Sequence, residues 1–341
     1  MIDLPSLSHL CALTDDTGVL QHAIGPIPNR AFGYCTDDIA RALAVAATRL
    51  QLDPLDANAD LILRTSLAYL AHAILPSGEF HNFMSHERTW LDDVGTEDSF
   101  GRAIYGLGMA VAKVADNDVR AVAHRLLASA LPNVANLRYV RAYAYAGTGA
   151  SWAFPTMPEA AGPMAEARDA LLHAYASEHS AQWDWFEPEL TYDNARLPEA
   201  LLRIGRALGD QRAIDVGLRT LAFLRKIVIE ENMFVPIGNE GWYPRGGVRA
   251  RYAQQPLEAT AMVEAQLAAY AITQDPQDYA VATLAHGWFT GQNTAGLVLA
   301  RGGGCCDGLS EDSVNPNMGA ESTLAYLMSA YALKHASPPS A

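Results

Sequence analysis

Apolar positions recur with helical spacing along most of the chain, in stretches of two alternating kinds. The first kind is rich in Ala and Gly, which let helices approach closely, so it is expected to form an inner layer. The second carries more charge and is expected outside it. The expected inner helices cover residues 37–50, 97–115, 138–148, 192–208, 256–273 and 319–335. The expected outer helices cover residues 60–74, 118–131, 164–176, 211–229 and 276–290.

This alternation predicts helical hairpins closed into a ring. Successive inner helices start about 40 to 65 residues apart, the length of one helical hairpin with its loop. Residues 1–30 are expected to supply or replace the missing sixth outer helix. The predicted fold is therefore all-α, an (α/α)6 toroid with long loops at the N-terminal ends of the inner helices. Short β segments are expected only within loops, at residues 78–84 and 232–237.

Composition indicates one globular domain that binds neither nucleic acid nor a membrane. No linker divides the chain, so residues 1–336 are expected to form one toroid domain and residues 337–341 a frayed tail. The net charge of −14 disfavours nucleic acid and anionic membranes, which need basic patches. No apolar run approaches the roughly 20 residues that span a bilayer, and no signal peptide is evident. A cytoplasmic location is expected.

The four cysteines suggest neither a disulfide framework nor a metal site. No CxxC or Cys/His spacing is present around Cys11, Cys35, Cys305 or Cys306. No metal or other cofactor is therefore expected.

Carboxylates stand at the starts of several inner helices. Acids there are stabilised by unpaired N–H groups and the positive end of the helix dipole. In repeated hairpins, however, equivalent helix ends lie on the same side of the molecule, so these acids are also expected to converge on one face. The acids concerned are Asp37, Asp38, Asp98, Asp193 and Glu321.

The loops before the inner helices combine aromatic, amide and charged side chains, which is typical of sugar sites. Aromatic faces stack on sugar rings, and acids and amides bond the hydroxyls. The alternative, that tryptophans such as Trp185 anchor the core, stays open for each one. The candidate binding residues in these loops are Trp90, His86, Arg88, Trp185, Glu187, Trp242, Tyr243, Gln255, Asp307 and Asn317.

Other catalytic motifs are missing from the sequence. It contains no GxGxxG opening a strand–helix unit, no Walker motif and no GxSxG elbow. His81 and His86 leave open a sugar epimerase or isomerase, because histidines act as proton shuttles near neutral pH.

Several longer strings resemble known families. The chain resembles a bacterial family of glycan-associated proteins. This resemblance rests on the strings FGYCTDDIARAL, GTEDSFGRAIYGLG, WDWFEPELTYDNARLPEALL, QQPLEATA and NPNMGAESTLAYL. That resemblance implies association with GT-B-type glycosyltransferases, as a fused or neighbouring protein. A weaker resemblance is to family 9 cellulases, (α/α)6 inverting glycosidases with a base early in the chain and an acid before the last inner helix. Asp37-Asp38 and Glu321 hold comparable places.

These features favour an inverting glycoside hydrolase acting on a bacterial oligosaccharide. Glycoside cleavage needs one protonated and one ionised carboxyl group. Glu321 is expected to be the acid, Asp38 the base and Asp37 a helix cap. Asp98 and Asp193 are expected to bind hydroxyls, with Arg41, Arg102 and Arg196 bracing the acids. Two alternatives remain, namely a non-catalytic glycan-binding domain serving a glycosyltransferase, and the epimerase.

Overall fold

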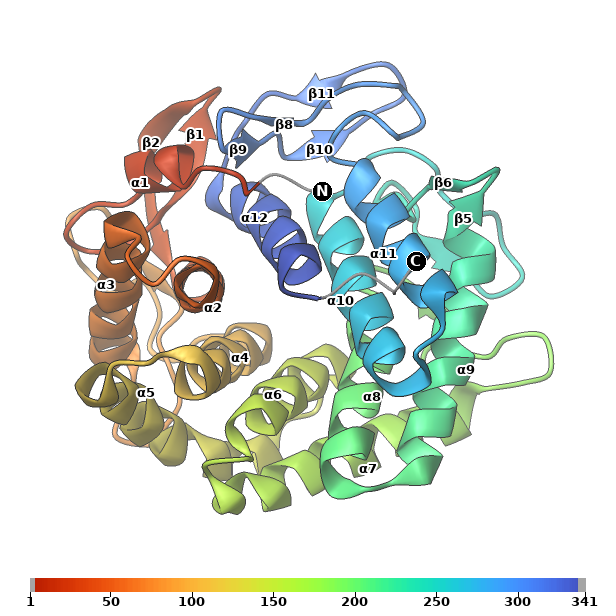
Figure 1. Ribbon diagram of the computed structural model, residues 1–341, viewed down its shortest axis with the longest axis horizontal. Coiled ribbons are helices and arrows are strands. Elements are labelled where there is room, and N and C mark those ends of the chain that lie inside the picture. Colours follow the sequence, from red (N-terminus) through yellow and green to blue (C-terminus); the bar gives the residue numbers. More distant parts are fainter. Residues whose placement is uncertain (1–3, 337–341) are drawn as a thin grey trace.

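The computed structural model describes residues 4–336 and shows a closed ring of six inner helices (Figure 1). Each inner helix packs against the next, and the last packs against the first. The inner helices are α2 (Thr36–Leu52), α4 (Glu97–Lys113), α6 (Val140–Ala153), α8 (Arg196–Leu208), α10 (Pro256–Thr273) and α12 (Ala320–His335). The predicted (α/α)6 toroid is confirmed. The prediction succeeded because helical periodicity and small residues are local signals, and tertiary packing did not override them here.

The outer helices surround this ring (Figure 1). They are α3 (Ala57–Ala73), α5 (Asn117–Ala130), α7 (Ala161–Glu178), α9 (Gln211–Val228) and α11 (Pro276–Gly287). The short helix α1 (Ser8–Leu13) packs on α12 and takes the sixth outer place, as expected for the first 30 residues. Two 3₁₀ helices, η1 (Leu131–Asn136) and η2 (Pro158–Ala160), lie in the connections. The expected frayed tail, residues 337–341, lies outside the described part of the chain.

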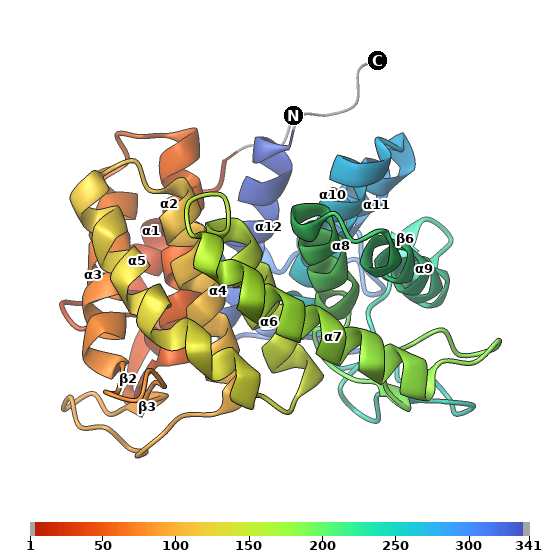
Figure 2. The same cartoon turned by 90° about the horizontal axis from the view of Figure 1, so that it is seen from below.

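Short strands lie within the long loops at one end of the ring, where the inner helices begin (Figure 2). The expected β segments are found as β3 (Phe83–Met84) and as β6 (Met233–Phe234), which pairs with β5 (Ile229–Glu230). The hairpin of β1 (Leu20–Ile24) and β2 (Ile27–Cys35), which β3 extends, was not predicted. The other pairs are β4 (Glu189–Leu190) with β7 (Tyr243–Pro244), β8 (Ala300–Arg301) with β9 (Gly304–Cys305), and β10 (Gly308–Leu309) with β11 (Val314–Asn315).

No helix within residues 4–336 is both long and apolar enough to cross a membrane.

Glycines allow α4 and α6 to touch along their backbones. A Cβ atom on Gly108 would lie 2.0 Å from the carbonyl oxygen of Gly149, and one on Gly149 would lie 2.3 Å from that of Ile104. These contacts are with backbone atoms, which cannot move aside without shifting a whole helix. The Gly-rich inner pattern therefore sets the distance between these two helices.

We expect Gly108→Ala to destabilise the protein by about 1–3 kcal/mol, the usual cost of overpacking a core. Chemical denaturation measures this change. Gly162→Ala in α7 is the matched control, because no atom lies within 4 Å of its added Cβ. Equal stability of the two variants would show that the ring tolerates a wider spacing between α4 and α6.

Candidate active site

A cavity of about 480 Å³ opens where α2, α10 and α12 begin. Several of its lining groups are carboxylates, which also makes the cavity acidic. Amide side chains from the loops line the remainder. The polar lining includes Asp37, Asp38, Arg41, Asn239, Gln254, Gln255, Asp307, Asn315 and Glu321.

One arginine holds two of these carboxylates. Arg41 Nη1 lies 3.0 Å from Asp38 Oδ1, and Arg41 Nη2 lies 2.8 Å from Glu321 Oε2. The guanidinium group is planar and rigid, so both carboxylates are held within the span of one group. The first and last inner helices are neighbours in the ring, and this brings residues 280 positions apart into contact.

The two carboxyl groups have opposite surroundings. The Asp38 side chain is only 9% exposed, and burial raises its pKa to about 8, outweighing the opposing effect of Arg41. The Glu321 side chain is 44% exposed and forms an ion pair with Arg41. The roles expected from the sequence therefore do not fit this geometry. Asp38 has the surroundings of the acid, and Glu321 those of the ionised carboxylate.

Asp37 is not a helix cap. No side chain caps α2 at its N-cap residue Cys35, and Asp37 instead faces two arginines. Its carboxylate lies 3.0 Å from Arg102 Nη1 and 3.5 Å from Arg41 Nη1. The arginines therefore brace the acids, as the sequence predicted, and they draw Asp37 away from the helix terminus.

Arg102 joins three inner helix starts. Its guanidinium group lies 3.5 Å from Asp98 and 3.9 Å from Asp193, besides its contact with Asp37. The group also stacks on the Tyr145 ring, 4.7 Å from the centroid. The predicted convergence of the acids is thus found as an ion network centred on Arg41 and Arg102.

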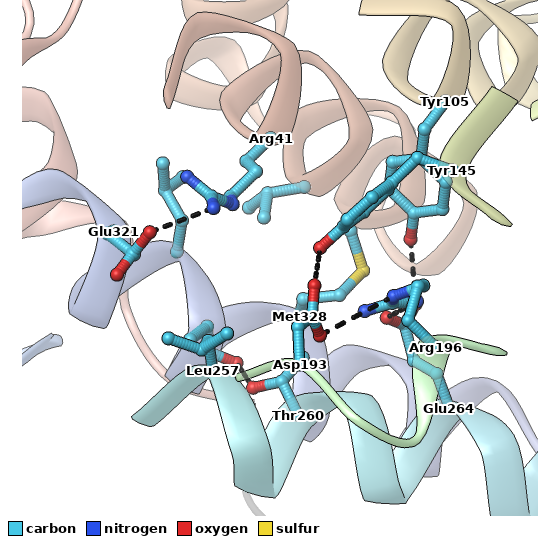
Figure 3. A pocket seen from close by; sticks show the side chains of 13 residues that line it. Arg41, Tyr105, Tyr145, Asp193, Arg196, Leu257, Thr260, Glu264, Glu321 and Met328 are labelled. Atoms are coloured by element: carbon cyan, nitrogen blue, oxygen red, sulfur yellow. Dashed lines mark hydrogen bonds and ion pairs between the residues drawn. The ribbon is translucent and has the colours of Figure 1, made fainter. Parts of the chain in front are cut away.

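A smaller cavity of about 30 Å³ lies deeper in the ring (Figure 3). Asp193 is fully buried there, with φ of +50°, and accepts a hydrogen bond from the Tyr145 hydroxyl. Asp193 Oδ1 and Arg196 Nε are 3.8 Å apart, and neither has a hydrogen-bond partner among the described residues. The volume and these two polar atoms suit a bound water molecule.

The acids that converge at this end of the ring do not all line one cavity. Asp38 and Glu321 line the larger cavity, whereas Asp193 and Glu321 line the deeper one. Asp98 instead borders a separate hollow of about 460 Å³. Glu187 also lines this hollow but is bound by Arg141 at 2.8 Å, so its carboxylate already has a partner.

The four expected sugar-stacking aromatics do not line the 480 Å³ cavity. Trp185 is completely buried against Phe186 and Phe223, so it is a core anchor. The Trp90 ring stacks on His81, with 4.6 Å between centroids. Tyr243 packs against Trp183, and Trp242 lies near Tyr192. Packing against neighbouring side chains covers Trp185 completely and the other three rings in part.

Two charged or titratable candidates in the loop before α4 also lie elsewhere. His86 stacks against the Tyr34 ring, and Arg88 forms an exposed ion pair with Asp16 at 2.6 Å. Among the candidates from later loops, Gln255 and Asp307 line the cavity. Asn317 does not line the cavity but contacts a residue that does. Its side-chain NH2 group donates to Asp307, and its side-chain oxygen accepts from the Ala23 N–H.

Several lining residues were missed, and three of them come from the sheet that β1, β2 and β3 form. Gln21 and His22 lie on β1, and Phe83 lies on β3 with 41% of its surface exposed. No local sequence pattern predicts that these residues line the cavity, because strand pairing across long loops brings them there. Phe83 is the aromatic side chain that borders the carboxylates. No group of three or more His, Cys, Asp or Glu within residues 4–336 is arranged to hold a metal ion.

Solved structures of carbohydrate enzymes share this fold. A sugar epimerase from a ruminal bacterium superposes with a TM-score of 0.73 at 11% identity, covering 97% of this chain and 96% of the epimerase. The GH76 α-mannanase BT2949 of Bacteroides thetaiotaomicron gives 0.67 at 13% identity, covering 96% and 93%. The cellulase Cel9M of C. cellulolyticum gives 0.63 at 10% identity, covering 93% and 88%. No family model and no curated protein matches the chain. At these identities the comparison establishes the (α/α)6 fold, including the predicted likeness to family 9 cellulases at that level.

Proposed function

We propose that this protein is a carbohydrate-active enzyme that hydrolyses glycosidic bonds. One observation carries the proposal. A single cavity holds a buried carboxyl group of raised pKa, Asp38, beside a more exposed carboxyl group, Glu321, and Arg41 contacts both. Glycosidases need this combination, and opposed environments of two carboxyl groups indicate their separate roles.

In the proposed reaction Asp38 protonates the leaving oxygen, and Glu321 stabilises positive charge on the sugar or activates water. Arg41 contacts both carboxyl groups and holds them within the span of one guanidinium group. The shared fold does not separate hydrolases from epimerases, because both classes have it. The carboxyl pair favours hydrolysis, since neither His81 nor His86 lines the cavity and its described lining holds one histidine, His22, rather than a pair on opposite sides of a sugar.

The proposed substrate is a neutral oligosaccharide. The acidic cavity and the net charge of −14 disfavour an anionic one. Amides such as Gln255 and Asn239 can bond hydroxyl groups, and Phe83 offers an exposed ring for a sugar face. Association with a glycosyltransferase stays a prediction.

A screen of bacterial oligosaccharides tests this function. The purified protein is incubated with each sugar, and released products and their anomeric configuration are followed by NMR. Hydrolysis with inversion is the expected result. Thermal stabilisation by a glycan without cleavage would instead indicate a binding domain, and epimerised sugar without chain shortening would indicate an epimerase. Either outcome would overturn the proposal.

The proposed acid predicts a pH limit for activity. Asp38 acts in its protonated form, so this requirement is met below its pKa and is lost as the pH rises through about 8. We therefore expect kcat/KM to fall tenfold per pH unit above about pH 8. A pH–rate profile on the substrate found in the screen measures this. A fall in kcat/KM that begins below pH 6 would contradict the assignment.

The exposed ring predicts a binding defect. Phe83→Ala removes the aromatic surface beside the carboxylates and is expected to raise KM by about tenfold, corresponding to about 1.4 kcal/mol. Phe83→Tyr keeps the aromatic face and is expected to restore binding. Steady-state kinetics of both variants provide the test. An unchanged KM for Phe83→Ala would place the sugar elsewhere.

A further inference from the structure

A second large cavity lies at the opposite end of the ring from the candidate active site. It has a volume of about 800 Å³ and is lined from the C-terminal ends of α4, α6, α8, α10 and α12. Apolar side chains form most of its wall, among them Met109, Phe154, Leu267 and Ile272. A concave, mostly apolar space of this size with a few polar groups is typical of small-molecule sites.

Two cationic side chains lie close to the ring of Trp152 in this cavity. The Lys113 ammonium and the Arg203 guanidinium each lie 4.7 Å from the Trp152 ring centroid. Lys113 is only 8% exposed, and Arg206 joins them at the rim. Lys113 donates one hydrogen bond, to the neutral Gln51 side chain at 2.9 Å. Within residues 4–336, no ion pair shorter than 4.0 Å involves Lys113 or Arg206.

The nearby carboxylates are already shared. Glu199 is bound by both Arg196 and Arg203, and Glu264 is bound by Arg196. Three cationic side chains, Lys113, Arg203 and Arg206, line the cavity with one carboxylate, Glu264. This local excess of positive charge is unusual in a protein with a net charge of −14.

Helix dipoles explain only part of this arrangement. Cations are favoured in the last turn of a helix, where Arg206 lies exposed to water on α8 and Lys113 lies buried on α4. Such interactions do not require burial, and burying an unpaired ammonium is costly. Burial and the nearby Arg203 lower the pKa of Lys113 to about 8. An anion seated beside Trp152 would supply the missing charge partner.

We propose that this cavity binds an anionic amphiphile, a small molecule with an apolar body and a carboxylate or phosphate head. The head contacts Lys113 and Arg206 beside Trp152, and the body lies on the apolar wall. This site is independent of the proposed hydrolase activity, because its lining and that of the 480 Å³ cavity have no residue in common.

Calorimetric titration of the full chain tests the proposal with four probes. Decanoate and decyl phosphate carry the expected head and body, and both are expected to bind. Decyltrimethylammonium has the same body with the opposite charge, and inorganic phosphate has the head alone. Both are expected to bind at least about tenfold more weakly. Preference for decanoate or for decyl phosphate distinguishes the two kinds of head.

Lys113→Met keeps the length of the side chain and removes its charge. We expect it to weaken binding of the preferred anion at least tenfold, as the loss of a charge-assisted contact would. Lys226→Met, at an exposed position on α9, is the matched control and should bind normally. If Lys113→Met does not fold, Arg206→Gln at the rim is the second variant. Absence of binding, equal binding of the cationic probe, or an unaffected variant would overturn the proposal.

Discussion

Replacing Asp38 by asparagine is expected to lower kcat by about 10²–10⁴-fold while substrate still binds. Asparagine keeps the shape of the side chain and its contact with Arg41 but cannot donate an acidic proton. The loss should be smaller for aryl glycosides with good leaving groups, because these need little protonation. Kinetics on a natural and an activated substrate measure both effects. This difference between substrates identifies the acid, whereas a fold defect would affect both equally.

Two further variants control this experiment. Glu258 is another buried carboxyl group whose pKa is raised to about 8 by burial, but it does not line the 480 Å³ cavity. Glu258 accepts hydrogen bonds from the backbone N–H groups of Asp193 and Asn194, so any loss in Glu258→Gln is expected to be equal on the natural and the activated substrate. Glu321→Gln should be slow on both substrates, since the ionised carboxylate is needed whatever the leaving group. If instead only the Glu321 variant responded to the leaving group, the two roles would be the reverse of those proposed.

Arg102→Met is expected to destabilise the protein by about 3–5 kcal/mol, the cost of removing one partner from a buried ion pair. The Arg102 side chain is 5% exposed and faces Asp37, Asp98 and Asp193. Without it their carboxylates would lose a shared counter-ion. The free energy of unfolding at pH 7, measured by chemical denaturation, gives the effect. The loss should shrink at low pH, because protonated carboxyl groups no longer need the positive charge.

Arg64→Met is the matched control for this prediction. Arg64 also contacts two aspartates, Asp60 and Asp116, but its side chain is 52% exposed. Exposed ion pairs contribute about 0–1 kcal/mol, so a small effect is expected. Equal losses from the two substitutions would show that burial does not govern the strength of the network.

Helix positions were predictable because their signals are local. The expected range 211–229 corresponds to α9 at Gln211–Val228, and the expected range 256–273 corresponds to α10 at Pro256–Thr273. Alternation of small-residue and charged helices also predicted which layer each would join. The β1–β2 hairpin was missed because its pairing depends on contacts with other loops, among them that between Met318 and Gly25.

Loop composition did not predict which aromatic side chains line the cavity. Trp185 and Phe83 both lie in loops near inner helix starts, yet the first is fully buried and the second borders the cavity. Loop composition predicted that aromatic and acidic groups would gather at this end of the ring. It did not predict which rings would face solvent, since that depends on how the loops pack on one another.

The sequence by itself determined the toroid, the end of the ring that carries the acids, and the arginines that accompany them. These follow from periodicity and from spacing along single helices. Only the tertiary structure distinguishes the surroundings of Asp38 from those of Glu321, on which their proposed roles rest. Burial raises the pKa of Asp38, and ring closure brings Arg41 into contact with Glu321 from the other end of the chain; neither burial nor this contact can be read from spacing along a single helix.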